Sequence, residues 1–413
     1  MAKPNLALIP AAQGSKLFSV LPSSGVGDFD FTRSGSATRI NSQGLIETVG
    51  NGVSRLNYPM IDGKVVGCPH HILEPVRTNL ITHSEDFSDS SWVKLGAGTG
   101  NAAIVTDNYA ISPDGTQNAS RLQCDLNGGV ASSGNQSLIA NVYSSSGNQT
   151  ISVYLKSNNE QNQNIYFANT QTSGDTITIT SEWQRFEFSY NTSTYVLAVG
   201  LRGRSGGAID DTADILIWGA QAEAGSYPTS YIKTNGSAVT RSAETATGSG
   251  DVATFNDSEG VLMFEGNIPK DENVFRNISI SDGSSNNFVT FYTTNTLNKI
   301  TYLLGAGGQG AVFGLDYFFQ DITIPFKIAL VYSSGRNEIW VNGIKVKQNS
   351  NTFNLMSGLN QLSFDNGTGS GNWYGNTKQV QYFETALIDS ELETLTSWVS
   401  FSDMAEGQLY SVE

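Results

Sequence analysis

Charged side chains are scarce in this 413-residue sequence, where Asp, Glu, Lys and Arg together make up 15% of the residues. Acids outnumber bases by 38 to 23, so the formal net charge is -15. An acidic surface repels both the phosphate backbone of nucleic acids and the anionic headgroups of a membrane. We therefore expect neither nucleic acid nor a membrane surface among the partners of this protein.

Cysteine is nearly absent, and long apolar runs are absent altogether. The two cysteines, Cys68 and Cys124, lie far apart without a CxxC pattern, so neither a disulfide framework nor a zinc site is indicated. We expect two separate buried thiols. No apolar run reaches the roughly 20 residues of a membrane-spanning helix. Because Pro4 and Pro10 interrupt the short apolar stretch at the start, we expect a mature N-terminus and no membrane insertion.

The usual catalytic patterns are missing as well. The three histidines, His70, His71 and His83, form no HExxH or His-x-His pattern, and the sequence has no GxSxG elbow, P-loop or dinucleotide-binding loop. The Glu-x-Asp-x-x-Glu signature of concanavalin-like hydrolases is also absent. We expect a protein that is not an enzyme. Glycoside hydrolysis stays open as an alternative, because it needs only two carboxylates at a defined separation.

Glycine, serine, threonine and asparagine are abundant, and apolar residues come in strand-length groups. In "QTISVYLKS", Ile151, Val153 and Leu155 alternate with polar residues, which is the period of a half-buried strand. "WQRFEFSY", "YVLAVGLRG" and "DILIWGAQ" follow the same pattern between polar turns. The fold class we predict is all-β, with tandem antiparallel β-sandwiches of the jelly-roll type.

A second group of strands follows a small polar stretch. "FKIALVY" and "EIWVNGIKV" flank "SSGRN", a loop typical of hairpins, and Asn342-Gly343 predicts a further turn. "DSELETLTSWV" predicts a short C-terminal helix capped by Asp389, with Leu392, Leu395 and Trp398 near one face. We place the boundaries at 1–78 for an irregular N-terminal segment, 79–234 for the first sandwich, 235–252 for an exposed linker and 253–413 for the second sandwich.

These stretches resemble known domain families. "EGVLMFEGNI", the hairpin and "QVQYFETALIDSELETLTSW" resemble a concanavalin A-like, laminin-G-type jelly roll found at the C-terminus of bacteriophage fibre and appendage proteins. "TNLITHSEDFSDSSWVK" and "WGAQAEAGSYPTSYIKT" resemble the two ends of a carbohydrate-binding-module-like jelly roll. "FTRSGSATRINSQGLIETV" is similar to the lead-in of the same phage proteins.

The resemblance implies a structural protein of the virion, in a tail or head fibre, assembled in the host cytoplasm. It implies a homo-oligomer, a trimer in many such proteins, that adheres to host-surface glycans through lectin-like domains. Residues 1–78 contain too little periodic apolar sequence for a sandwich of their own, so we assign them to oligomerisation and to attachment to other virion proteins. A purely architectural component and a virion-associated glycan hydrolase are the alternatives.

The best candidate for glycan binding is the loop "FDNGTGSGNWYGNTKQ". Sugars stack on aromatic faces and bond to amide and carboxylate groups, and loops on rigid sandwiches commonly carry such sites. The candidate residues are Asp365, Asn366, Trp373, Tyr374 and Asn376. The opposing interpretation, that Trp373 and Tyr374 pack against a strand or another subunit, has equal weight.

Two further interpretations concern other residues. Four tryptophans lie in or beside expected strands and favour core positions: Trp92, Trp183, Trp218 and Trp340. The resemblance to carbohydrate-binding jelly rolls implies a structural calcium ion between the first and last strands, with Glu85, Asp86 and Asp214 as candidate ligands. Asp210, Asp211 and Asp214 precede a strand, where a turn or a calcium site explains them at least as well as a catalytic carboxylate pair does.

Overall fold

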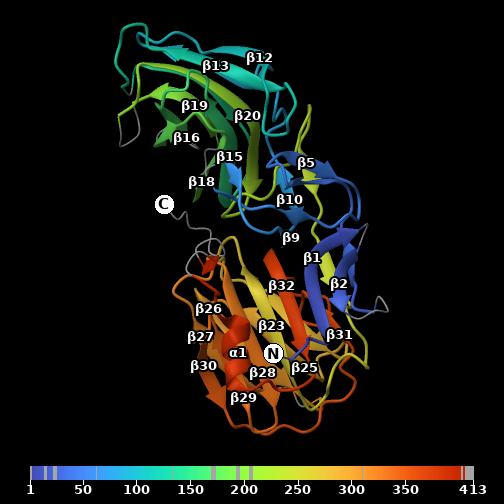
Figure 1. Ribbon diagram of the computed structural model, residues 1–413. Helices are drawn as coiled ribbons and strands as arrows, with labels where there is room; N and C mark the ends of the chain where they lie inside the picture. The colour runs from blue at the N-terminus through green and yellow to red at the C-terminus, as the bar shows by residue number, and fades with distance from the viewer. Residues whose placement is uncertain are drawn as a thin grey trace.

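The structure is a computed structural model that describes residues 2–13, 16–21, 26–61, 63–132, 134–168, 174–191, 196–203, 208–308, 310–400 and 403–404. It is an elongated, nearly all-β molecule with two lobes, and the N-terminal segment runs between them (Figure 1). Both lobes are antiparallel β-sandwiches, so the predicted fold class is confirmed. No helix in these ranges combines the length and the apolar character that crossing a membrane requires.

The first sandwich consists of two five-stranded sheets. One sheet has the order β11 (Trp92–Ala97), β14 (Gln136–Val142), β19 (Val196–Arg202), β16 (Gln163–Ala168) and β17 (Asp175–Ile179). The other has the order β12 (Ile104–Ala110), β13 (Ala119–Asp125), β20 (Thr212–Ala224), β15 (Asn148–Ser157) and β18 (Gln184–Asn191). Side chains such as Ile139 and Ile151, one from each sheet, meet in one buried core. Ile151, Val153 and Leu155 share the inward face as predicted and are fully buried, but Ser152 between them is buried as well, so β15 is covered on both faces there rather than half-buried.

The second sandwich has one large and one small sheet. The large sheet runs β22 (Thr245–Thr247), β3 (Phe29–Thr32), β2 (Lys16–Leu21), β1 (Leu6–Gln13), β32 (Gly375–Phe383), β23 (Glu259–Asn267), β28 (Phe326–Ser333), β29 (Asn337–Val341) and β30 (Ile344–Asn349), with β9 (His70–Leu73) and β6 (Leu56–Asn57) joined beside β32. The small sheet runs β27 (Ala311–Phe318), β26 (Lys299–Gly305), β25 (Phe288–Thr293), β24 (Asn277–Ser281) and β31 (Gln361–Ser363). One apolar core fills the space between the two sheets.

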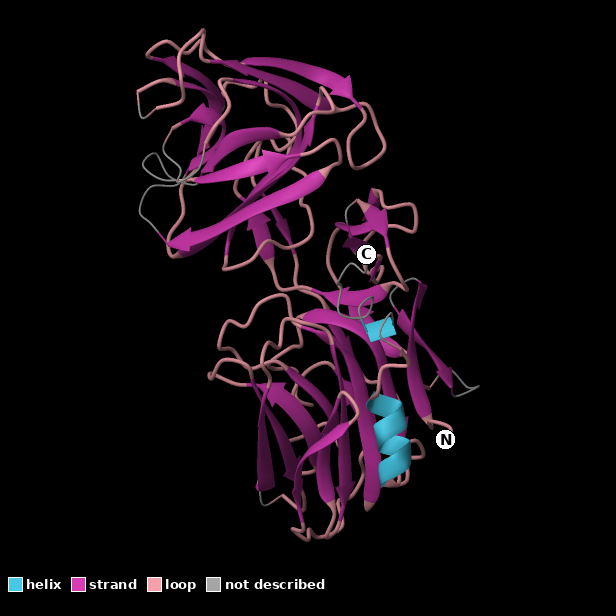
Figure 2. Ribbon diagram, turned by 60° about the vertical axis from the view of Figure 1, so that its left-hand side comes forward, coloured by secondary structure: helices cyan, strands magenta, loops and turns pink. Residues whose placement is uncertain are grey.

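The predicted turns and helix are present, with one correction. The loop after β28 and the Asn342-Gly343 turn join β28, β29 and β30, and both turn residues have positive φ, 47° and 86°. Helix α1 (Asp389–Thr396) covers the outer face of the large sheet through Leu392 and Leu395 (Figure 2). Asp389 does not cap it, because the N-cap position is Ile388; the Asp389 carboxylate instead forms ion pairs with Arg336 and Lys345.

The N-terminal segment is built into both lobes. Strand β1 pairs with β32, while Phe29 and Phe31 of β3 are buried in the core of the second sandwich. The hairpin of β4 (Ala37–Ile40) and β5 (Ile46–Val49) places Ile46 against Trp218 on the outer face of the first sandwich. Two smaller pairs are β7 (Met60–Ile61) with β8 (Lys64–Val65), and β10 (Arg77–Asn79) with β21 (Val239–Arg241). The segment forms no sandwich of its own, as expected, but it packs against both lobes of its own chain.

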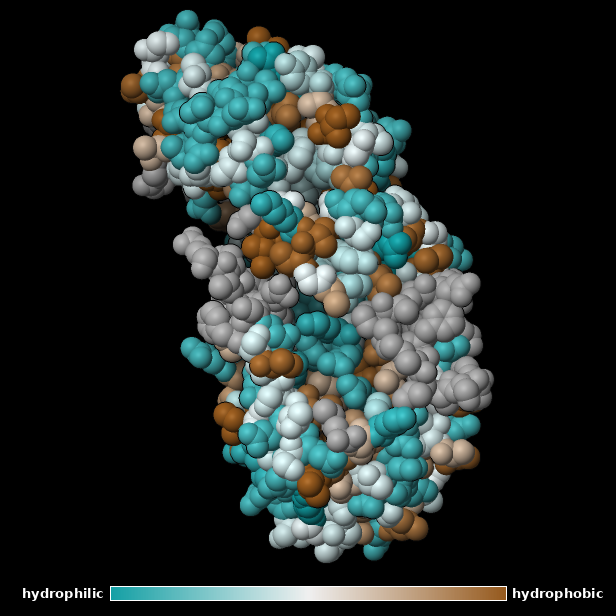
Figure 3. Space-filling model, viewed as in Figure 1, coloured by the Kyte–Doolittle hydropathy of each residue, from teal (hydrophilic) through white to brown (hydrophobic). Residues whose placement is uncertain are grey.

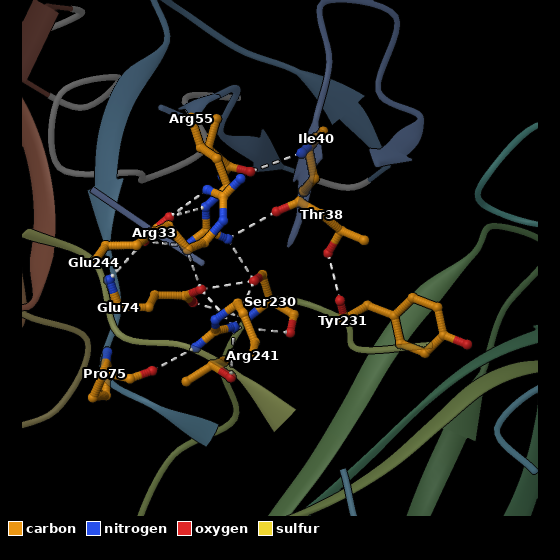
Figure 4. A network of polar contacts seen from close by, with 12 residues as sticks. Arg33, Thr38, Ile40, Arg55, Glu74, Pro75, Ser230, Tyr231, Arg241 and Glu244 are labelled. Atoms are coloured by element: carbon orange, nitrogen blue, oxygen red, sulfur yellow. Dashed lines mark hydrogen bonds and ion pairs between the residues drawn. The ribbon is translucent and has the colours of Figure 1, made fainter. Parts of the chain in front are cut away.

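A buried ion network joins the segment to the connection between the sandwiches (Figure 4). The Arg33 Nη1 and Glu244 Oε1 atoms lie 2.8 Å apart, and both side chains are fully buried. Glu74 lies 2.7 Å from Arg55 and 2.8 Å from Arg241. Burial disfavours the charged form of Glu74, but the two guanidinium groups outweigh it and hold the pKa of this carboxyl below its usual range. Three separate parts of the chain are thus fixed to one another.

The stretch 235–252 is only partly the exposed linker that its composition suggests. Residues 235–240 are exposed, whereas Arg241, Glu244 and Ser249 are buried. The reason is that β21 and β22 pair with strands of the N-terminal segment, and Glu244 neutralises two of its arginines. The exact domain boundaries stay predictions.

Most of the tryptophans and cysteines that the sequence places in the core are buried. Trp92, Trp218 and Trp340 are buried, while Trp183 is half-buried. Cys68 and Cys124 are separate free thiols, but only Cys124 is buried; Cys68 is exposed in the turn before β9, which corrects that part of the expectation. Burial raises the pKa of the Cys124 thiol to about 12, so this cysteine stays protonated and inert.

Candidate functional site

A groove of about 490 Å³ lies on the outer face of the small sheet of the second sandwich. Along β25, Val289 and Phe291 point into the core, so Phe288, Thr290 and Tyr292 point to the opposite face. These outward side chains form the floor. The walls come from β24, β26 and the loop after β31, and the lining residues are Phe275, Asn277, Ser285, Phe288, Thr290, Tyr292, Leu303, Asn366, Thr368, Ser370 and Gly371.

Aromatic surface is available at one end of the groove. Phe275 is 56% exposed, and its ring centroid lies 5.8 Å from that of Tyr292. Phe288 and Tyr292 are half-buried, so each presents part of its ring to solvent. Figure 3 draws the opposite face of the second sandwich, the one that carries α1; there most of the surface is hydrophilic, and apolar residues gather mainly where the two lobes meet. Partly exposed rings beside hydroxyl and amide groups form the kind of surface that binds small polar ligands.

The loop after β31 forms the polar wall and is held by its own side chains. The Asn366 Oδ1 atom accepts hydrogen bonds from the Thr368 N–H at 3.0 Å, the Thr368 hydroxyl at 2.8 Å and the Ser370 N–H at 3.1 Å. The Asp365 Oδ1 atom accepts one from the Gly367 N–H at 2.6 Å. Burial raises the pKa of the Asp365 carboxyl. The wall is therefore shaped before any ligand arrives.

Two glycines let this loop approach the sheet closely. A Cβ atom on Gly371 would lie 2.3 Å from the Asn277 Nδ2 atom, and one on Gly367 would lie 2.5 Å from the Ser281 hydroxyl. Both residues have positive φ, 63° and 83°. The Asn277 side chain donates to the Gly371 carbonyl at 3.0 Å, which fixes the loop to β24. Glycine is required here for space and for conformation.

The five predicted glycan-binding residues separate into different environments. Asn366 lines the groove, and Asp365 holds the loop turn behind it. Trp373 has no exposed surface, since its ring packs edge-on against Phe264 and Phe291 at 5.0 and 5.5 Å between centroids. It is a core residue and cannot stack on a sugar.

The other two predicted residues also lie away from the groove. Tyr374 is half-buried against the same core. The Asn376 side chain donates to the Asn267 Oδ1 atom at 3.0 Å and lines a smaller hollow beside His70. Of the expected loop, only its first half forms the wall.

The aromatic floor was not among the predicted residues. "FVTFYT" alternates large side chains over β25, and this pattern alone cannot tell which side faces the core. Phe275 lies just before β24, next to the polar residues Arg276 and Asn277. An aromatic residue in such a position is the signal for a binding surface that the sequence offers. The polar, glycine-rich composition of the loop favours residues 365–376 instead.

The candidate calcium ligands do not come together. Asp214 forms a 2.6 Å ion pair with Arg121 and accepts a hydrogen bond from Asn158 at 3.1 Å. Glu85 is bound by Lys233 at 2.7 Å and by the Tyr231 hydroxyl at 2.9 Å. The Asp86 carboxylate accepts bonds from Ser88 and Asp89, within its own turn. These acids do not fit a shared ion, and among the described residues no three His, Cys, Asp or Glu side chains gather to hold a metal.

Comparison with known proteins yields partial structural similarities. No protein-family model and no curated protein matches the sequence. Among solved structures, the CBM40 of the Ruminococcus gnavus IT-sialidase bound to alpha2,3 sialyllactose is 16% identical, with 34% of this chain and 84% of that chain covered and a TM-score of 0.29. Domain 4 of an extracellular arabinanase from Geobacillus stearothermophilus in complex with arabinotriose is 10% identical, with coverage of 38% and 73% and a TM-score of 0.31.

Sheep galectin-11 in complex with glycerol is a third similar structure. It is 11% identical, with 32% of this chain and 86% of that chain covered and a TM-score of 0.21. Each match therefore spans about a third of this chain at a low score, and none of them assigns a ligand to the groove.

Proposed function

We propose that this protein is a glycan-binding protein whose second sandwich binds saccharides in the groove over β24, β25 and β26. The observation that carries the proposal is the pairing of the exposed Phe275 ring with Tyr292, opposite a polar wall already held in place by Asn366. A sugar ring has an apolar face and polar edges, and the groove offers a partner to each.

The groove supports binding rather than catalysis. Its described lining residues include no carboxylate, imidazole or thiol. Glycoside hydrolysis needs two carboxyl groups on either side of the bond, which the groove does not provide. We propose that the protein is not an enzyme. Incubating it with bacterial surface polysaccharides should release no reducing sugar, and release that disappears on mutation of an acid would contradict this.

The proposed biological setting is the virion. The sequence resemblance to phage fibre and appendage proteins supports a structural protein that presents its sandwiches to glycans on the host surface. In this setting it assembles as a homo-oligomer, a trimer in many such proteins, and it contacts other virion proteins. Mass spectrometry of purified particles would test the location, and analytical ultracentrifugation of the full chain would test the oligomer. Absence from particles would leave the glycan-binding proposal standing.

The groove is tested by a matched pair of variants. Phe275 and Phe318 are 56% and 58% exposed, but only Phe275 lines the groove. Phe275→Ala should weaken binding to saccharides that bind on a glycan array by about tenfold, or about 1.4 kcal/mol, whereas Phe318→Ala should leave it unchanged. Equal effects of the two substitutions, or no effect of either, would place the ligand elsewhere.

A further inference from the structure

A second hollow, of about 510 Å³, lies at one end of the first sandwich. It is lined by the connection between β11 and β12, the end of β13, the connection between β15 and β16, and the start of β20. Amide side chains dominate its wall: Asn101, Gln123, Asn159, Gln161, Asn162 and Gln163. None of these residues belongs to the groove of the second sandwich, so the two sites are separate.

The inner wall is braced by Gln163, whose side chain is 4% exposed. Its Nε2 atom donates to the Ser157 hydroxyl at 2.7 Å and to the Asp214 carbonyl at 2.8 Å. Its Oε1 atom accepts from the Asp214 N–H at 2.7 Å. Both ends of this amide are engaged within the protein, so the position of the wall does not depend on a ligand.

The rim carries amides with free hydrogen-bonding capacity. The Asn159 Oδ1 atom accepts from the Ser157 hydroxyl at 2.9 Å and from the Gln161 N–H and the Gln163 Nε2 atom at 3.2 Å each. Among the described residues nothing accepts from the Asn159 NH2 group, which is therefore available as a donor for a ligand. Glu160, between them, has a φ of 59°, a conformation that is uncommon for a residue with a side chain. This tight turn holds Asn159 and Gln161 at the mouth. Asn162 is exposed beside them.

Two carboxylates give the hollow a negative charge. The Asp125 Oδ1 atom accepts the Asn127 N–H at 2.7 Å, and the Asp210 Oδ2 atom accepts the Asn164 N–H at 2.8 Å; each carboxylate keeps a second oxygen. Asp214 also lines the hollow, but Arg121 neutralises it. The described lining residues include no lysine, arginine or histidine. An acidic ligand would therefore meet repulsion, and an amine would meet attraction.

We propose that this hollow is a second saccharide-binding site, specific for sugars without acid groups. Hydroxyl groups would pair with the amides, and a hydroxyl or ammonium group would donate to Asp125 and Asp210. Ile104, which is 61% exposed, gives the rim an apolar contact. The groove relies on aromatic surface, whereas this site relies on hydrogen bonds and charge.

The test is isothermal titration of the full chain with matched monosaccharides. Each set, in the gluco, galacto and manno series, compares the neutral sugar, the 2-amino sugar and the uronic acid. In the series that binds, we expect the amino sugar to bind more tightly than the neutral sugar, and both to bind at least tenfold more tightly than the uronic acid. Asn162→Ala should weaken that binding at least tenfold. Asp210→Asn, which can still accept the Asn164 N–H, should remove the preference for the amino sugar.

The groove variant Phe275→Ala serves as the control and should leave this binding unchanged, with melting temperatures confirming that all variants fold. Preferred binding of a uronic acid, or no binding in any series, would overturn the inference. Binding that Phe275→Ala abolishes and Asn162→Ala leaves intact would also overturn it, while supporting the groove. The reverse result would support the hollow and remove the groove from the proposed function.

Discussion

The two sandwiches obtain their strands in different ways. All ten strands of the first come from one continuous stretch, residues 92–224. The large sheet of the second recruits β1, β2, β3, β6 and β9 from the N-terminal segment and β22 from the connection. The first sandwich therefore contains nearly everything it needs, whereas the second depends on strands from the opposite end of the sequence.

The difference extends to the cores. The N-terminal segment supplies Leu6, Leu8, Phe29, Phe31 and Leu73 to the core of the second sandwich, each at most 3% exposed. To the first sandwich it supplies mainly Ile46, which packs on the outside of a sheet that already has its own core. The segment is thus a structural part of one lobe and a cover on the other.

The largest expected effect follows from deleting residues 2–77. Burying a large apolar side chain contributes about 1.5–3 kcal/mol, so losing five of them removes about as much free energy as a whole domain has, roughly 5–15 kcal/mol. The second sandwich should fail to fold, while the first should stay folded. Hydrogen exchange followed by mass spectrometry would measure both at once. Preserved protection in residues 259–383 would contradict this dependence.

The next effect concerns the ion network between the lobes. In Glu244→Gln, Arg33 and Arg55 lose a charged partner while all three side chains stay buried. Breaking a buried pair in this way costs about 3–5 kcal/mol, which urea denaturation would measure. Glu47→Gln is the matched control, because it breaks an ion pair with Arg39 that is partly exposed and should cost about 1 kcal/mol or less. Similar losses in both variants would show that burial of the network matters little.

The sequence predicts features that depend on neighbouring residues, such as turns. It does not predict which strands pair when they lie far apart in the chain. The hairpin of β28 and β29 and the Asn342-Gly343 turn were predictable, because loop length and positive φ depend on neighbouring residues. The pairing of Leu6 with Tyr382 was not, because nothing near either residue specifies a partner more than 370 positions away. Four-residue strands such as β3 resemble loops until a sheet from another part of the chain completes them.

The same limit applies to the candidate site. Asn366 was predictable as part of a loop with a polar, glycine-rich composition, and it lines the groove. Trp373 and Tyr374 are adjacent aromatics just before β32, and only the packing of this part of the chain decides that the tryptophan faces the core. Phe275 becomes part of a site because the sheet brings it to Tyr292, which sequence position alone does not indicate.

A smaller effect concerns the loss of stability at low pH, to which His71 on the side of the second sandwich contributes. His71, on β9 beside the second sandwich, is 1% exposed, and neither ring nitrogen has a hydrogen-bond partner among the described residues. Burial, with the nearby positive charge of Arg55 and with the neighbouring imidazole of His70, lowers the pKa of this imidazole to about 3. Below pH 6.5 the unfolded chain binds a proton that the folded chain rejects, so stability falls by up to about 1.4 kcal/mol per pH unit down to about pH 3.

His71→Leu should reduce this pH dependence. Urea denaturation at several pH values between 4 and 6 should give a shallower slope for the variant than for the wild type. At pH 8 histidine is neutral in both states, so the two slopes should be equal there. Parallel slopes between pH 4 and 6 would show that His71 does not titrate as the structure indicates.

The smallest expected effect is that of one tryptic cut between the lobes, which should leave the two pieces associated. Trypsin can reach the Lys233 side chain, which is 61% exposed, and residues 235–240 are exposed as well, whereas Thr234 between them is buried and must open locally for the cut. Arg241 has a buried side chain that donates to the Pro75 carbonyl at 2.8 Å, so it should resist cleavage. Limited digestion should therefore cut after Lys233, and Lys233→Gln should abolish the cut in this region.

The two pieces of the nicked protein should remain together, because contacts across the cut hold the lobes independently of the connecting chain. Glu244, on the C-terminal piece, stays bound to Arg33 and Arg55 on the N-terminal piece, and β1 stays paired with β32. Size-exclusion chromatography under native conditions should give one peak at the position of the intact chain, and denaturing electrophoresis should give two bands. If the pieces separate without denaturant, the N-terminal segment does not join the sandwiches, and the connection alone does so. If Arg241 is cut as readily as Lys233, the ion network around Glu74 opens easily in solution.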